Sequence, residues 1–90
     1  MDLAWIKASL GKHEQARRLI DRALQTVPDD PYVHYYNGLM LNRLGDTAGA
    51  LDALGSAVDL GYSTRLLSID PYLANLQENT KFEELLRLSR

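Results

Sequence analysis

The sequence repeats itself at an offset of 34 residues, and this internal repeat constrains the fold more than any other feature. Identical residues meet at four aligned pairs: Leu10 with Leu44, Gly11 with Gly45, Ala16 with Ala50, and Ala23 with Ala57. Apolar residues of similar size share the same register: Ile6 with Met40, Ile20 with Leu54, and Leu24 with Val58. A period of this length is typical of stacked repeats in which each unit is a pair of helices. The repeat therefore predicts an all-α protein.

Apolar periodicity and helix-terminating residues predict four helices in the repeating part. They span residues 2–10, 13–26, 31–44 and 47–60, and Asp30 and Asp46 stand where they would cap the third and fourth. The four repeated alanines are small enough to let paired helices approach closely. Gly49 and Gly55 fall inside the fourth helix, where each costs up to about 1 kcal/mol relative to alanine. We expect close contact with a neighbouring helix to offset that cost.

The repeat ends near Gly61, because Asn79 and Glu84 then fall where glycine and alanine are required. The tail carries its own helix signals. They are a short apolar cluster over 64–69, the cap-plus-proline pair Asp70-Pro71, and a capping-box spacing from Thr80 to Glu83. These signals predict a broken helix, a second short helix and a final helix. An array of repeats needs such a cap, since its last helix pair would otherwise expose an apolar face.

Composition argues against several classes of protein. Ninety residues support one domain, and the longest apolar run is far shorter than the roughly 20 residues of a membrane-spanning helix. A net charge of −2, with basic and acidic residues interspersed, provides no field for a phosphate backbone or an anionic membrane. The densest basic cluster, Arg17, Arg18 and Arg22, is best explained as a solvated helix face. No secretory signal is visible, so we expect a cytoplasmic protein.

No arrangement of residues in the sequence requires catalysis or a metal. There is no cysteine, and His13 and His34 lie in different repeats with no carboxylate at ligand spacing. The serines lack a nucleophile elbow, and the glycines form no phosphate-binding loop. The pairs Asp29-Asp30 and Glu83-Glu84 stand at helix starts, where the helix dipole stabilises a carboxylate. We therefore expect no enzyme activity, no cofactor and no metal site.

The spacing of small and bulky residues resembles the tetratricopeptide repeat (TPR) family. In that family a Trp, a Leu-Gly pair and a Tyr mark the first helix of a repeat, two small residues and a bulky one mark the second, and a Pro closes it. The second copy supplies His34, Asn37, Gly38 and Leu41, then Ala50, Leu54 and Ala57, with Tyr62 in place of Pro. The first copy supplies Leu3, Ala4 and Lys7, then Ala16, Ile20, Ala23 and Pro28.

This resemblance implies a single domain of stacked antiparallel hairpins, a short right-handed α-solenoid. Repeat one would cover about 1–30, repeat two about 31–61, and a capping tail about 62–90. The tail is similar to segments that close such arrays in some bacterial multidomain proteins, including certain Ser/Thr kinases and transcriptional regulators. Repeat one begins about four residues late. Met1 would then start a truncated repeat, or the chain would be part of a longer protein, or the bare face would pair with a second copy.

The resemblance also implies a binding surface, because the first helix of each TPR repeat lines a concave groove that binds peptides. Tyr32, Tyr35, Tyr36 and Leu39 share one face of the third helix at i, i+3, i+4 and i+7. The alternative is that this stripe packs as core, at least through one of Tyr35 and Tyr36. The predicted groove residues are Trp5, Ser9, Tyr32, Tyr35, Tyr36, Leu39, Asn42 and Arg43. Tyrosines replace the Lys and Asn of the family's carboxylate clamp, so the groove would favour an apolar helix or extended segment.

From these patterns we expect a non-catalytic module, an adaptor or scaffold, that binds a peptide or helix of another protein. Two alternatives stay open. One is a homo-oligomerisation unit, in which the aromatic face or the first repeat is buried against a second copy. The other is the regulatory end of a larger bacterial enzyme or transcriptional regulator.

Overall fold

Six helical segments make up residues 13–87, the part of the chain that the computed structural model describes, and no strand occurs among them. In chain order they are α2 (His13–Thr26), α3 (Pro31–Arg43), α4 (Thr47–Asp59), α5 (Thr64–Ser68), the 3₁₀ helix η1 (Pro71–Leu76) and α6 (Thr80–Arg87). The prediction of an all-α protein is confirmed for this part. The predicted helix at 2–10, with Trp5 and Ser9, lies outside the described residues.

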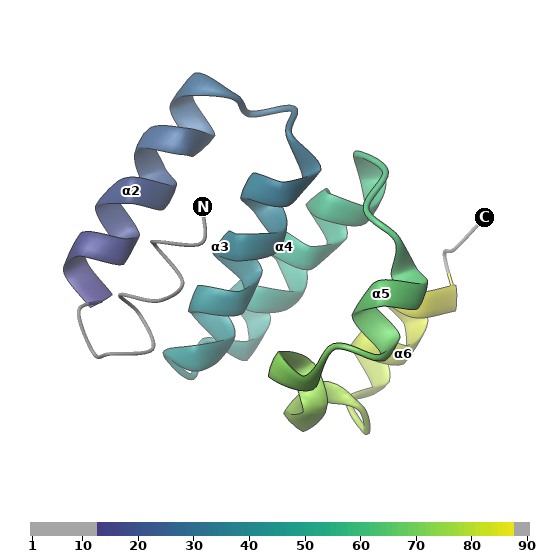
Figure 1. Cartoon of the computed structure of the whole chain (residues 1–90). Coiled ribbons are helices and arrows are strands. Elements are labelled where there is room, and N and C mark those ends of the chain that lie inside the picture. Colours follow the sequence, from purple (N-terminus) through teal and green to yellow (C-terminus); the bar gives the residue numbers. More distant parts are fainter. Residues whose placement is uncertain (1–12, 88–90) are drawn as a thin grey trace.

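Helices α3 and α4 form a central antiparallel hairpin, with α2 on one side and the tail on the other (Figure 1). Both helices begin at the aspartates that the sequence predicts. Asp30 accepts a hydrogen bond from the Tyr32 amide at 2.9 Å, and Asp46 accepts one from the Gly49 amide at 2.9 Å. Between the helices Gly45 has a φ of 87°, in the left-handed region that favours glycine.

The two helices of the hairpin pack closely at Gly38. A Cβ atom there would lie 2.7 Å from Leu54 Cδ2 and 3.3 Å from the Ala50 carbonyl oxygen, so a side chain at this position would force Leu54 to shift. The expectation that Gly49 and Gly55 make the close contacts is wrong. A Cβ at Gly49 would meet the Asp46 cap, and one at Gly55 would come no nearer than 3.9 Å to Leu85.

Two apolar clusters hold the segments together. The smaller joins α2 to α3 through Ala16, Ile20 and Met40. The larger joins α3 and α4 to the tail; its buried members are Leu39, Leu54, Leu67, Leu73, Leu76, Phe82 and Leu85. Of the four repeated alanines, Ala16, Ala50 and Ala57 are fully buried and Ala23 is half-buried.

The tail packs against the hairpin and contributes five of the seven buried residues of the larger cluster. Its three segments match the predicted order, with Asp70 capping η1. The predicted capping box at Thr80 is wrong. The side chain of Asn79, one residue earlier, accepts the hydrogen bond from the Phe82 amide at 3.1 Å, so Asn79 caps α6.

Candidate partner-binding surface

The described residues of the predicted groove all lie on α3, but the structure gives them different surroundings. Tyr32, in the first turn, is 58% exposed, and Arg43, at the end, is also exposed. Tyr35, Tyr36 and Asn42 are half-buried. Leu39 is 2% exposed and packs in the larger cluster with Leu54 and Phe82. Leu39 therefore belongs to the core, as in the alternative interpretation, and is not available to a partner.

Four tyrosine rings form a continuous contact in the first half of α3. The Tyr36 ring meets Tyr35 in an edge arrangement, with centroids 5.3 Å apart. The Tyr35 and Tyr62 rings are stacked, with centroids 4.5 Å apart and planes 12° apart. Tyr32 meets Tyr62 in an edge arrangement, with centroids 5.7 Å apart and planes at 83°. Tyr62 comes from the connection between α4 and α5, and sequence reasoning noted it only as a replacement for proline. Tyr62 lies 34 residues after Pro28, at the equivalent position of the repeat. That equivalence was the sequence signal that could have predicted its contact with the start of α3.

The Tyr35 phenol is fixed by the tail. Its hydroxyl donates a hydrogen bond to Asp70 Oδ2, while Asp70 Oδ1 accepts one from the Tyr72 amide at 2.9 Å. Burial raises the pKa of Tyr35 well above its ordinary value, and the bond to the Asp70 carboxylate raises it further. Burial also raises the pKa of Tyr62. Both phenols therefore stay protonated at neutral pH and act as neutral packed groups.

Asn42 lies in the second half of α3 and is hydrogen-bonded to η1. Its amide pairs reciprocally with the Asn75 amide, with both N···O distances at 2.9 Å, and it also donates to the Tyr72 carbonyl oxygen at 3.2 Å. The tail thus covers the part of α3 around Leu39 and Asn42. Tyr32 remains the exposed aromatic side chain of this helix face.

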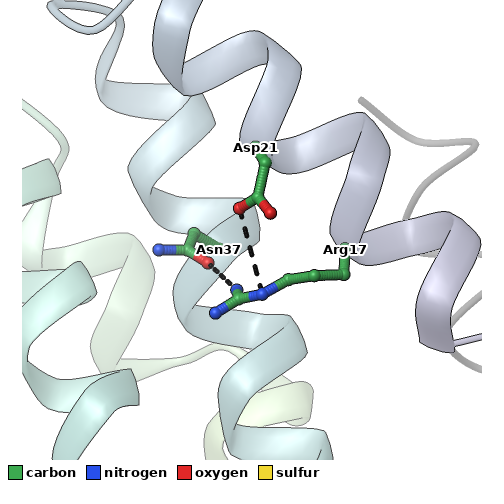
Figure 2. Close-up of polar contacts among 3 residues, drawn as sticks. All are labelled: Arg17, Asp21 and Asn37. Atoms are coloured by element: carbon green, nitrogen blue, oxygen red, sulfur yellow. Dashed lines mark hydrogen bonds and ion pairs between the residues drawn. The ribbon is translucent and has the colours of Figure 1, made fainter.

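The basic cluster on α2 is exposed, as the sequence predicts, and one member also ties two helices together. Arg17 Nη1 donates to the Asn37 side-chain oxygen on α3 at 3.1 Å, and Arg17 Nε lies 3.9 Å from Asp21 Oδ1 (Figure 2). Arg18 lies 3.8 Å from Glu14, and both of these side chains are largely exposed. Exposed pairs of this kind contribute little to stability.

Three of the seven large apolar side chains that are exposed in the described residues lie where α3 begins and α4 ends. Figure 1 places these two helix ends on the same side of the molecule. Val27 precedes α3, Tyr32 lies in its first turn, and Leu60 caps α4. They are 44%, 58% and 37% exposed, respectively. We call Val27, Tyr32 and Leu60 the loop-end patch.

Metal-binding clusters are absent from the described part of the chain. Residues 13–87 contain no group of three or more His, Asp or Glu side chains placed to hold a metal ion. His34 donates from Nε2 to the Pro28 carbonyl oxygen at 2.7 Å, which fixes the loop before α3. None of the described helices has the length and apolar character needed to cross a membrane.

No protein family, curated protein or solved structure matches this chain.

Proposed function

We propose that this chain is a non-catalytic protein-interaction module of the TPR type. Its hairpins stack as a short solenoid, and it binds a peptide or helix of another protein at the start of α3. The internal repeat and the Gly38–Leu54 contact within the α3–α4 hairpin support the repeat architecture. The tail, packed along α3 and α4, takes the place of a further repeat.

One observation carries the proposal: an exposed aromatic side chain stands on a rigid support. Tyr32 contacts Tyr62, Tyr62 stacks on Tyr35, and the Tyr35 hydroxyl is bonded to the nearly buried Asp70. A tyrosine offers a large contact area with few rotatable bonds, so little conformational entropy is lost when a partner covers it. Residues of this type are common energetic anchors of interfaces.

The proposed surface is smaller than the groove predicted from the sequence. It includes Tyr32 and its neighbours in the loop-end patch, and leaves out Leu39, which is buried, and Asn42, which is bonded to the tail. A surface of this size fits a short segment bound with modest affinity, because it contains a single large anchor.

The test is a selection of random 12-residue peptides displayed against the purified chain, followed by binding measurements on synthetic copies of the enriched peptides. We expect peptides that bind in the micromolar range and lose at least about fivefold in affinity when Tyr32 is replaced in Tyr32→Ala, a loss equivalent to about 1 kcal/mol. The matched control is Leu44→Ala. Leu44 is also exposed, but stands 12 positions along the chain, about 18 Å away at the helical rise per residue.

Thermal melts of both variants separate binding from folding, because an exposed side chain should contribute little to stability. If no enriched peptide depends on Tyr32, or if Leu44→Ala weakens binding as much as Tyr32→Ala, the proposed site is wrong.

A further inference from the structure

Charge is distributed unevenly along the chain, although the total is close to neutral. Between Ala23 and Thr64 there are five aspartates and one basic residue, Arg43, which ends α3. The five aspartates are Asp29, Asp30, Asp46, Asp52 and Asp59. The central hairpin with its loops is therefore acidic, while the segments on either side of it carry nearly all of the basic residues.

Three of these aspartates lie at the end of the hairpin that carries the loop-end patch. Asp29 and Asp30 directly precede α3, and the Asp30 side chain caps it by accepting from the Tyr32 amide. Asp59 is the last residue of α4, three positions before Tyr62. None of the three forms an ion pair with another residue in the described range 13–87. On α2, by contrast, Glu14 and Asp21 each have an arginine within 4 Å.

An aromatic ring and carboxylates together favour one kind of side chain. The face of a tyrosine ring carries partial negative charge and attracts a cation, and the guanidinium of arginine can stack on the ring while it donates hydrogen bonds to carboxylates. The Tyr32 ring is exposed and meets Tyr62 in a perpendicular arrangement, so the two rings form a corner. Asp30 is bonded to the backbone of Tyr32, and Asp59 stands three positions before Tyr62.

We propose that the segment bound at the loop-end patch is basic, and that an arginine or lysine of the partner lies on the Tyr32 ring near Asp29 and Asp59. This inference rests on the proposed function and names the chemistry of its partner. Apolar neighbours of that cation would cover Val27 and Leu60. An acidic segment is disfavoured, because it would bring like charges to Asp29, Asp30 and Asp59.

The selection described above also tests the inference, since its enriched peptides can be compared with the unselected library. We expect arginine and lysine to be enriched and aspartate and glutamate to be depleted among peptides that require Tyr32. Replacement of the critical arginine by citrulline, which has the same shape and no charge, should weaken binding by roughly three- to tenfold. Raising the salt concentration should weaken the arginine peptide more than the citrulline peptide.

Two matched aspartate substitutions in the protein test which carboxylate attracts the arginine of the peptide. Asp59→Asn should weaken the arginine peptide and leave the citrulline peptide unchanged. Asp52→Asn removes the same charge from the same helix two turns earlier, at an exposed position away from Tyr32, and should have little effect.

The outcomes separate the inference from the proposed function. Peptides that need Tyr32 but are neutral or acidic, or that bind equally with arginine and citrulline, would overturn the basic partner and leave the interaction site intact. Basic peptides that are equally sensitive to Asp52→Asn and Asp59→Asn would show general attraction to an acidic protein and would also overturn the inference. An absence of Tyr32-dependent peptides would count against both.

Discussion

At the scale of single residues, the Tyr35 phenol joins α3 to the tail through the Asp70 carboxylate. Asp70 is only 9% exposed and uses its other oxygen to cap η1, so both of its oxygens are engaged by this chain. A buried carboxylate that loses a donor is poorly solvated, and its desolvation is then uncompensated. The Tyr35 hydroxyl should therefore matter more to stability than the other phenols of α3.

Tyr35→Phe tests this expectation, because it removes the hydroxyl and keeps the ring that stacks on Tyr62. We expect a loss of about 1–3 kcal/mol in the free energy of unfolding, measured by urea denaturation. Tyr32→Phe is the control, since its ring is exposed, and it should stay within about 0.5 kcal/mol of the parent. Equal values for the two variants would mean that the Tyr35–Asp70 bond contributes no net stability.

The raised pKa of Tyr35 also predicts sensitivity to alkali. The ordinary pKa of tyrosine is 10.0, and that of folded Tyr35 is higher. Above pH 10 the unfolded chain releases this proton while the folded chain keeps it, so the unfolded state gains stability as the pH rises. The contribution is present in full below pH 10. Urea denaturation between pH 8 and 11 should show a decline in stability that is shallower in Tyr35→Phe, and parallel curves would contradict the assignment.

At the scale of elements, the α3–α4 hairpin depends on the absence of a side chain at Gly38. Leu54 and Ala50, the residues that face it, are fully buried. Gly55 lies in the same hairpin in ordinary surroundings, with only a distant contact to Leu85. The two glycines therefore provide a matched pair that differs in packing.

Gly38→Ala should destabilise the chain by about 1–3 kcal/mol, because the overpacked Cβ would force Leu54 or the helices apart. Gly55→Ala should stabilise it by up to about 1 kcal/mol, since alanine is the better helix former and no atom obstructs it. Thermal melts of the two variants should move in opposite directions. A shift of both to higher temperature would show that the hairpin is not closely packed at Gly38.

The start of α6 offers a second matched pair, Asn79 and Thr80. Asn79 accepts from the Phe82 amide, so Asn79→Ala should cost about 0.5–2 kcal/mol. Thr80→Ala should change stability little, because Thr80 is exposed within the first turn and does not serve as the cap. Urea denaturation measures the loss in the free energy of unfolding for each variant. A larger loss for Thr80→Ala would show that Thr80 caps α6, as the sequence predicts.

At the scale of the whole molecule, the sequence predicts most of what depends on neighbouring residues, with the cap of α6 as the exception, and misses what depends on how the tail packs on α3. The caps Asp30, Asp46 and Asp70 are local signals, and each was predicted. The Tyr35–Asp70 hydrogen bond joins residues 35 positions apart, and no pattern in the sequence predicts it. Tyr32 and Leu39 share one helix face, so periodicity assigns them one role; the tail covers Leu39 and leaves Tyr32 exposed. The candidate site could thus be placed on α3, but its extent required the fold.

The last prediction concerns the tail, whose packing determines which part of α3 stays open. Phe82 is fully buried in the larger cluster, so Phe82→Ala should cost about 3–5 kcal/mol. Glu83→Ala is the control at the adjacent exposed position and should cost less than about 1 kcal/mol, because it removes only a carboxylate from the first turn of α6. A chain cut after Gly61 loses five of the seven buried residues of the larger cluster and should uncover Leu39 and Leu54. It should melt at a much lower temperature and aggregate, because an apolar face of α3 and α4 would then lie in water. Thermal melts and size-exclusion chromatography measure both effects. A truncated chain that stays monomeric and melts like the full chain would show that α3 and α4 are stable without the tail, and the face around Leu39 and Asn42 would then be open to a partner as well.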